Sequence, residues 1–348
     1  MPEKVGKASR EFDVLLAGYF GFHNLGDELL ASSAIKMLTD CGVQNERIAI
    51  LTAGGDYGVA AFDRWDLRSV IRAIGRSQTL LYAGGGLFQD ATSLRSCFYY
   101  WGLSFIAAKL SCTTWAMGQS VGPFRTRVAR SLARNAFAGC KYVTVRDDLS
   151  RQLLSSIGVD SRPIPDLVLG LSVPDIRQSD QGPVLINVRP TTDGEAGRLI
   201  ARLAAKFAAK GIPMIGIALS PEDVAEFERL KISHTMPDMP VHTIDSIGEF
   251  APLVAGCLAA VGVRLHFGIL CYLAGIEPWL YPYDPKVRAF AESFGLELLH
   301  LKQGEEGFDI TNLLTNNAHG VKSKSEAFYG RIKSEFELAL GSVIGGSL

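Results

Sequence analysis

Short apolar runs alternate with amphipathic segments along the first half of the chain. The apolar runs predict strands at 14–17, 47–52, 79–83, 113–117 and 142–145. The segments between them have helical periodicity and predict helices at 27–39, 96–110, 127–137 and 147–157. Short, wholly apolar strands separated by helices indicate a parallel sheet that is covered on both faces.

The alternation stops at about residue 161 and resumes at about residue 183. The interval contains Pro163, Pro165, Pro174 and Pro183 and few periodic positions, which is typical of an interdomain linker. Beyond it, strands are predicted at 184–188, 213–218, 257–261 and 278–281. Helices are predicted at 195–210, 221–231, 265–274 and 285–294, and a last amphipathic helix over 323–340.

This pattern predicts an α/β protein with two doubly wound, Rossmann-like domains facing a cleft, as in GT-B glycosyltransferases. We expect an N-terminal domain at 1–165, a linker at 166–182, a C-terminal domain at 183–322 and a C-terminal helix at 323–348. In such sheets, ligands bind outside the carboxyl ends of the strands. Candidate chemistry is therefore sought in the loops that follow the predicted strands.

Composition and charge narrow the function classes. The 348 residues are 47% hydrophobic and 20% charged, with a formal net charge of −1, so no overall basic charge attracts nucleic acid. The start of the chain has no apolar signal-peptide core, and no run of about 18 apolar residues predicts a membrane span. Six cysteines without a C-x-x-C pair are typical of reduced thiols in a cytoplasmic protein.

Three glycine-rich loops follow predicted strands of the first domain, with the sequences GYFGFHNLGDE from residue 18, GGGLFQD from 84 and GQSVGP from 118. Glycines let the backbone approach a ligand closely, and a helix N-terminus favours an anion or a polar oxygen. Helix caps and ordinary connecting loops are the alternative interpretation. The candidate residues in and behind these loops are Asn24, Gly26, Asp27, Gly85, Gly86, Gln89, Asp90, Arg95 and Gln119.

Four candidate cationic side chains also stand at strand ends or helix starts. Arg146 ends a predicted strand, with a local ion pair to Asp147 or Asp148 as the alternative. Arg264 and His266 lie where a predicted strand meets a helix, which favours anion binding. Lys286 stands in a first helical turn, where a cation is unfavourable unless an anionic ligand binds. The other histidines form no metal-binding spacing, so nothing in the sequence requires a metal.

Six stretches of the sequence together resemble the polysaccharide pyruvyl transferase family, in particular bacterial enzymes that pyruvylate cell-wall or exopolysaccharide sugars. They are GYFGFHNLGDE, GGGLFQDATS, GQSVGP, VRDDLS, VRLHFGI and YDPKV, and they occur in this order between residues 18 and 287. The resemblance thus extends over both predicted domains.

This resemblance implies a GT-B-like fold, phosphoenolpyruvate as the donor, and neither a metal nor another cofactor. It implies that a pyruvate ketal forms on a sugar of a polysaccharide or of its lipid-linked precursor. The second domain would be the donor side, with Arg264, Leu265 and Lys286 binding the donor and His266 acting as the acid. Arg146 of the first domain would also bind the donor. The first domain would be the acceptor side. Asp27 would be the base there, assisted by Asn24.

Two other functions share this pattern. A GT-B glycosyltransferase would use a nucleotide sugar, and the only candidate for contacting its ribose is the acidic pair Glu305 and Glu306. A non-catalytic sugar-binding protein would not need several cations in one cleft.

A basic helix face also bears on where the protein acts. Arg127, Arg130 and Arg134 are spaced to share one face of a predicted helix. They could hold a cytoplasmic protein at the inner face of a membrane. A solvated helix face is the alternative.

Overall fold

The computed structural model describes residues 10–90, 93–173, 182–304, 309–314 and 321–344. The chain forms two compact units that interleave along the sequence. Unit 1 comprises Met1–Phe22, Leu30–Leu167 and Arg331–Leu348, and unit 2 comprises His23–Leu29 and Val168–Gly330. The short segment at the start of the first helix therefore belongs to a different unit from the residues on either side of it.

Unit 1 is built around one parallel sheet whose strand order is β3-β2-β1-β4-β5-β6-β7. Its strands are β1 (Phe12–Ala17), β2 (Ile48–Thr52), β3 (Ala60–Asp63), β4 (Ser77–Ala83), β5 (Thr113–Gln119), β6 (Tyr142–Val145) and β7 (Arg162–Pro163). β2 is fully buried and β1, β4 and β5 are almost so, because helices cover both faces of the sheet.

Four of the five α-helices that the structure describes in this half of the chain begin at side-chain caps. The five helices are α1 (Leu25–Asp40), α2 (Leu67–Gly75), α3 (Leu94–Lys109), α4 (Arg127–Ala138) and α5 (Asp148–Ser156). The capped helices are α2 to α5, where Asp66, Ser93, Thr126 and Asp147 each accept a hydrogen bond from a backbone N–H in the first turn that follows. Two short 3₁₀ helices are η1 (Asn45–Arg47) and η2 (Leu167–Gly170).

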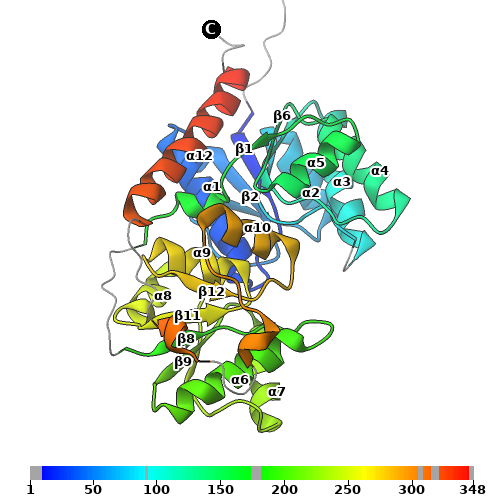
Figure 1. Ribbon diagram of the computed structural model, residues 1–348. Helices are drawn as coiled ribbons and strands as arrows, with labels where there is room; N and C mark the ends of the chain where they lie inside the picture. Colours follow the sequence, from blue (N-terminus) through cyan, green and yellow to red (C-terminus); the bar gives the residue numbers. More distant parts are fainter. Residues whose placement is uncertain (1–9, 91–92, 174–181, 305–308, 315–320, 345–348) are drawn as a thin grey trace, which may run out of the picture. The chain divides into compact units, whose positions relative to one another are not determined.

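Unit 2 contains a second parallel sheet with the order β10-β9-β8-β11-β12. Its strands are β8 (Val184–Ile186), β9 (Met214–Ala218), β10 (Val241–Thr243), β11 (Ala259–Gly262) and β12 (Pro278–Leu280). Its helical segments are α6 (Glu195–Ala209), α7 (Pro221–Ile232), α8 (Ile247–Val254), α9 (Leu265–Leu273), α10 (Pro285–Phe294), η3 (Leu301–Gly304) and α11 (Thr311–Leu314). Figure 1 shows α6 and α7 on one side of these strands and α9 on the other.

The last helix, α12 (Val321–Ile344), joins unit 1 from Arg331 onward. Its side chains Ile332, Phe336 and Ala339 are buried. The hydroxyl of Tyr142 donates to the Glu335 carboxylate. The C-terminal part of α12 therefore belongs to unit 1, the same unit that contains β1.

The predicted fold class is confirmed, since both sheets are parallel and doubly wound. The two sheets share one feature of strand order: β1 lies between β2 and β4, and β8 lies between β9 and β11. At β1 and at β8 the order of the strands changes direction. Such a switch point opens a crevice for ligands at the carboxyl ends of the neighbouring strands.

The sequence pattern missed several short strands and α-helices, namely β3, β7, β10, α2, α8 and α11. β3 alternates half-buried and exposed residues, and β10 is exposed throughout. Short edge strands of this kind bury little apolar surface and so have a weak hydrophobic signal. The predicted linker at 166–182 is described as far as residue 173, and it includes the buried residues Leu167, Val168 and Leu169.

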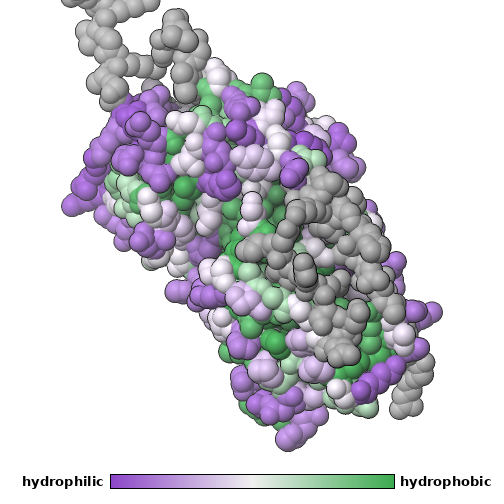
Figure 2. All heavy atoms as spheres, turned by 90° about the vertical axis from the view of Figure 1, so that its left-hand side faces the viewer, coloured by the Kyte–Doolittle hydropathy of each residue, from purple (hydrophilic) through white to green (hydrophobic). Residues whose placement is uncertain are grey.

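Figure 2 shows hydrophilic and hydrophobic side chains interspersed on this face of the molecule. Within the described residues, no helix is long and apolar enough to cross a membrane.

Candidate active site

The imidazole of His266 lies against the first turn of α1 within unit 2. A Cβ atom added to Gly26 would come within 2.0 Å of His266 Nδ1. The carbonyl of Asn24 accepts from the N–H groups of Asp27 (2.9 Å) and Glu28 (3.1 Å), which starts the helix. Gly26 is therefore needed because any larger residue would displace the imidazole.

The turn that carries Arg264 and His266 is fixed by a buried asparagine at the end of β8. Asn187 Oδ1 accepts from the backbone N–H groups of Arg264 (2.9 Å) and Val263 (3.3 Å). Its amide nitrogen donates to the carbonyl of Ile217 at 2.9 Å. One side chain thus joins the carboxyl ends of β8, β9 and β11 at the switch point of the sheet. Leu265, the first residue of α9, is buried in this turn.

The guanidinium of Arg264 is held by acidic and hydroxyl groups from the start of α7. Arg264 Nε lies 2.7 Å from both carboxylate oxygens of Asp223, and Nη2 donates to Ser220 Oγ at 2.5 Å. Only 7% of Arg264 is exposed, and Asp223 is fully buried. Burial raises the pKa of the Asp223 carboxyl, and the charge of Arg264 opposes that rise. This pair fixes the orientation of Arg264.

Two further cations stand at the carboxyl ends of strands in unit 2. Lys286 is in the first turn of α10, and its ammonium lies 3.4 Å from the Asp284 carboxylate, whose other oxygen caps the helix. Arg189, three residues after β8, donates to the Tyr283 hydroxyl at 2.5 Å, and its Cζ lies 5.0 Å from that ring's centroid. Arg189 was not among the predicted site residues, although it directly follows the strand predicted at 184–188 and its place at a strand end could have marked it as a candidate.

In unit 1, Gln119 and the glycines after β4 form a compact turn. Gln119 is buried, and its amide nitrogen donates to the carbonyls of Tyr82 (3.1 Å) and Gly84 (2.8 Å). Gly84 and Gly85 have φ values of +67° and +79°, a region that favours glycine. The carbonyl of Gly85 accepts from Ser120 N at 2.8 Å, and Gly86 follows. Hydrogen bonds thus tie the ends of β4 and β5 together.

Asp90 fixes the next part of this loop to the start of α4. Its carboxylate accepts from Arg125 N (2.6 Å), Thr126 N (2.8 Å) and Thr126 Oγ1 (2.6 Å). Burial would raise the pKa of Asp90, but these hydrogen bonds outweigh it and hold the pKa below the ordinary value. Gln89 is half-buried beside it, and Arg95 is exposed in the first turn of α3.

Arg146 lies in a buried ion pair within unit 1. Its Nη1 is 2.5 Å from Asp166 Oδ2, and its Nε donates to Ser120 Oγ at 2.8 Å. The side chain is only 5% exposed. The partner in this pair comes from beyond β7, 20 residues along the chain, whereas Asp147 caps α5.

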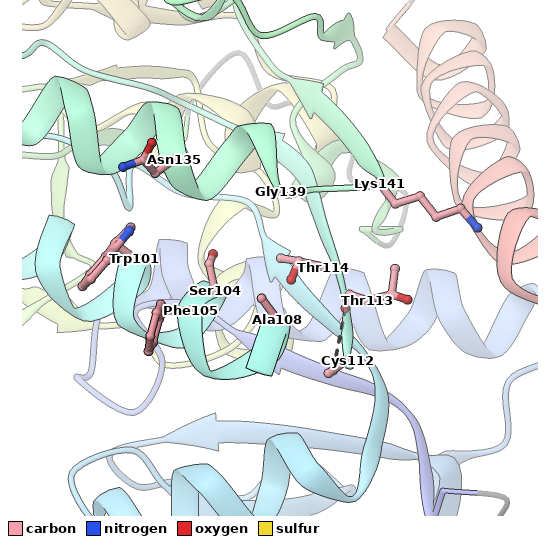
Figure 3. Close-up of a pocket in the computed structure, with 10 residues that line it drawn as sticks. All are labelled: Trp101, Ser104, Phe105, Ala108, Cys112, Thr113, Thr114, Asn135, Gly139 and Lys141. Atoms are coloured by element: carbon pink, nitrogen blue, oxygen red, sulfur yellow. Dashed lines mark hydrogen bonds between the residues drawn. The ribbon is translucent and has the colours of Figure 1, made fainter. Parts of the chain in front are cut away.

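A cavity of about 580 Å³ lies elsewhere in unit 1, between α3, α4 and the amino end of β5. Figure 3 shows Trp101 and Phe105 of α3 on one side and Asn135 of α4 on another. None of the predicted site residues lines this cavity. In the part of the chain that is described, no group of three or more His, Cys, Asp or Glu side chains could hold a metal ion. The acidic pair Glu305 and Glu306 lies outside the described residues.

With this geometry established, comparison with known families identifies the chain. The family model of polysaccharide pyruvyl transferases matches residues 24–285, which is about three quarters of the sequence. The chain belongs to the polysaccharide pyruvyl transferase family. The matched region begins at Asn24 and includes Gly26, Asp27, Arg264 and His266, and it ends one residue before Lys286. A search of curated proteins found no significant match.

Solved structures with the same fold support a GT-B-like architecture for this family member. UDP-GlcNAc 2-epimerase from Methanocaldococcus jannaschii, in complex with UDP-GlcNAc and UDP, has a TM-score of 0.57 at 8% identity, covering 91% of this chain and 98% of the epimerase. The Neisseria meningitidis UDP-GlcNAc 2-epimerase bound to UDP-GlcNAc has a TM-score of 0.55 at 11% identity, covering 93% and 100%. An O-GlcNAc transferase mutant from Thermobaculum terrenum has a TM-score of 0.51 at 12% identity, covering 96% of this chain and 68% of the transferase. At these identities the likeness concerns the fold alone.

Proposed function

We propose that this family member transfers the pyruvyl group of phosphoenolpyruvate to two hydroxyls of one sugar, forming a ketal and releasing phosphate. The acceptor is a sugar of a polysaccharide or of its lipid-linked precursor. The observation that carries the proposal is the cluster at the start of α9 in a chain of this family. There His266 lies against Gly26, and Arg264, two residues before it, is held in place by Asp223.

Phosphoenolpyruvate carries a phosphate and a carboxylate, so its binding site needs several cations. We assign Arg264, Lys286 and Arg146 to the donor, with Leu265 closing the turn behind Arg264. Asp223 and Ser220 occupy Nε and Nη2 of Arg264, so we assign its Nη1 edge to the donor. Arg189 is a further candidate, since it too follows a strand at the switch point of this sheet.

The chemistry begins at the enol double bond. A proton is added to C3, which becomes the methyl carbon, and C2 becomes oxocarbenium-like. We assign His266 as the acid that gives this proton. A sugar hydroxyl attacks C2 and loses its proton to Asp27, with Asn24 helping to position the hydroxyl. The C2–O bond to phosphate then breaks, phosphate leaves with the bonding electrons, and the cations stabilise its charge. The neighbouring hydroxyl attacks C2, loses its proton and closes the ketal ring.

We assign the acceptor to the loops of unit 1. Gly86 is exposed and leaves the backbone open to a sugar, whereas Gly85 is buried and shapes the turn before it. Gln89 and Arg95 offer polar groups. Asp90 and Gln119 support these loops through hydrogen bonds to backbone groups. The six free cysteines favour a cytoplasmic site of action, and a lipid-linked acceptor would bring the protein to the inner face of the membrane.

The test compares donors directly. The purified protein is incubated with a panel of free and lipid-linked saccharides and either phosphoenolpyruvate or UDP-sugars. We expect phosphate release from phosphoenolpyruvate and a saccharide product heavier by one pyruvyl ketal in mass spectrometry. His266→Ala should abolish this release, and Asp27→Asn should slow turnover while keeping donor affinity. UDP release without phosphate release would instead establish the glycosyltransferase alternative.

A further inference from the structure

Aromatic rings surround Arg64 at the carboxyl ends of β1 and β3 in unit 1. The Arg64 Cζ lies 4.8 Å from the ring centroid of Tyr99 and 5.0 Å from that of Phe22. The ring centroids of Trp65 and Tyr19 are 5.3 Å and 5.9 Å away. We call Tyr19, Phe22, Trp65 and Tyr99 the aromatic platform. Its rings come from the loop after β1, the turn after β3 and the helix α3.

Arg64 is a buried cation held mainly by rings. It is 5% exposed, and its Nη1 donates to the Gly18 carbonyl at 2.6 Å. Its Nε is buried without a hydrogen-bond partner, and in the described part of the chain the guanidinium forms no ion pair with a carboxylate. A buried charge of this kind is costly unless it is compensated, and the ring faces supply compensation through cation–π attraction. Arg64 thereby fixes the positions of the rings around it.

The outer rings of the platform are exposed although they are fixed. Tyr19 is 44% exposed and Trp65 is 67% exposed. Tyr19 stacks on Phe22 with centroids 4.0 Å apart and planes 11° apart, and Phe22 meets Trp65 edge to face at 6.0 Å. The backbone N–H of Trp65 donates to Asp63 Oδ1 at 2.8 Å, which ties the turn to the end of β3. Contiguous exposed rings that are held rigid are typical of a binding surface.

The chemistry of this surface suits a pyranose ring. One face of a pyranose presents C–H groups with partial positive charge, which are attracted to the negative face of an indole or phenol ring. The hydroxyls at the sugar's rim stay in water or meet polar side chains. Arg95 is such a side chain, because it is exposed and stands one helical turn before Tyr99 on α3.

We infer that the aromatic platform is a saccharide-binding subsite, in which Trp65 and Tyr19 stack on an uncharged pyranose ring of the acceptor. This inference rests on the proposed function, which supplies the saccharide. Beyond the proposed function, the inference names the residues that contact the sugar and states that the sugar ring is uncharged. Phe22 stands two positions before Asn24 in the sequence. The platform is therefore close along the chain to Asn24 and Asp27, to which we assign the positioning and deprotonation of the acceptor hydroxyl.

The experiment measures binding without turnover. Saturation-transfer difference NMR is recorded on the full-length protein with methyl glycosides of glucose, galactose, mannose and N-acetylglucosamine. Trp65→Ala and Tyr19→Ala are compared with Phe105→Ala, which removes a 50% exposed ring at the amino end of the same sheet. Removing Trp65 or Tyr19 also takes one ring face away from Arg64, so a small fall in the melting temperature is expected, and cooperative unfolding above the assay temperature is checked for each variant. Phosphate release from phosphoenolpyruvate is measured separately on the same proteins.

We expect saturation of the C–H protons on one pyranose face in the wild type and in Phe105→Ala. The dissociation constant should rise about tenfold in Trp65→Ala and Tyr19→Ala, the factor for losing one aromatic contact. Equal signals in all four proteins, or no signal with any glycoside, would overturn the inference. Saccharide binding that depends on Trp65 without any phosphate release would uphold the subsite and reject the pyruvyl transfer.

Discussion

At the scale of single residues, the contact between Gly26 and His266 depends on the absence of a methyl group. The backbone of Gly26 is helical, and a Cβ there would come within 2.0 Å of His266 Nδ1, which is far closer than van der Waals contact allows. We expect Gly26→Ala to reduce phosphate release about 100-fold, since a displacement of about 1 Å in a catalytic group can cost that much. Initial rates measured at saturating phosphoenolpyruvate would show it.

The control is Gly102→Ala in α3, where an added Cβ meets nothing within 4 Å. That variant should keep its activity and gain about 0.5–1 kcal/mol in free energy of unfolding. A Gly26→Ala enzyme with the wild-type rate would show that the position of His266 is unimportant.

Lys286 offers the cleanest test of the donor site, because its side chain is 32% exposed and its removal should not disturb the core. We expect Lys286→Ala to weaken phosphoenolpyruvate binding about tenfold, or ~1.4 kcal/mol, through loss of one charge-assisted contact. Isothermal titration calorimetry measures this directly. Arg288→Ala removes an exposed cation of the same helix and should leave the affinity unchanged; equal weakening in both variants would indicate only a general charge effect.

Residue patterns identified Arg264 and His266 but not the side chains that hold them. Arg264 and His266 lie where a predicted strand runs directly into a predicted helix, and such a junction can be recognised from the sequence alone. Asp223 lies 41 positions from Arg264 and Asn187 lies 77 positions away. Partners at such separations meet only through the order of strands in the sheet, so no local spacing could reveal them.

At the scale of elements, Asp90 connects the glycine loop after β4 to the N-terminus of α4. Its three hydrogen bonds lower its pKa below the ordinary value of 3.8. A depressed carboxyl pKa stabilises the fold above the unfolded-state pKa, and the contribution is lost as the pH falls through the folded-state pKa. We expect Asp90→Asn to lower the free energy of unfolding by about 2–3 kcal/mol at pH 7.

Urea denaturation of both proteins over a range of pH checks this. The difference between wild type and Asp90→Asn should shrink as the pH falls below about 3.8. A difference that stays constant down to pH 2 would mean that the carboxylate charge is not what holds the loop.

Long, periodic elements could be predicted from the sequence, whereas short exposed ones could not. All nine predicted helices correspond to helices of the described structure, and β1, β4, β5 and β6 occur where apolar runs predicted them. β3 was missed because its alternate residues are exposed. That omission also hid Arg64 and Trp65, which follow β3, so the aromatic platform became visible only in three dimensions.

At the scale of the whole molecule, the basic face of α4 bears on where the protein works. Arg127, Arg130 and Arg134 are exposed, and Arg130 donates to Ser156. We expect weak binding to anionic vesicles, at about 1 kcal/mol per arginine near the surface, that declines at high salt. In co-sedimentation, the triple glutamine variant of these arginines should bind less and still process a soluble acceptor.

The matched control replaces Arg198, Arg202 and Lys210 by glutamine, which removes the same charge from exposed positions of α6 and its C-cap. It should bind vesicles like the wild type. Equal loss in both triple variants would assign the effect to net charge and remove any special role for α4.

The interleaving of the two units limits how this family can be recombined. Residues His23–Leu29 belong to unit 2, although the chain on both sides of them belongs to unit 1. A hybrid that joins the first 165 residues of one relative to the remainder of another would combine a Gly26 turn and a His266 turn that were never selected together. Exchange of acceptor specificity between relatives by cutting at the linker should therefore often yield inactive proteins. A hybrid that carries the seven-residue segment along with its native unit 2 should recover activity.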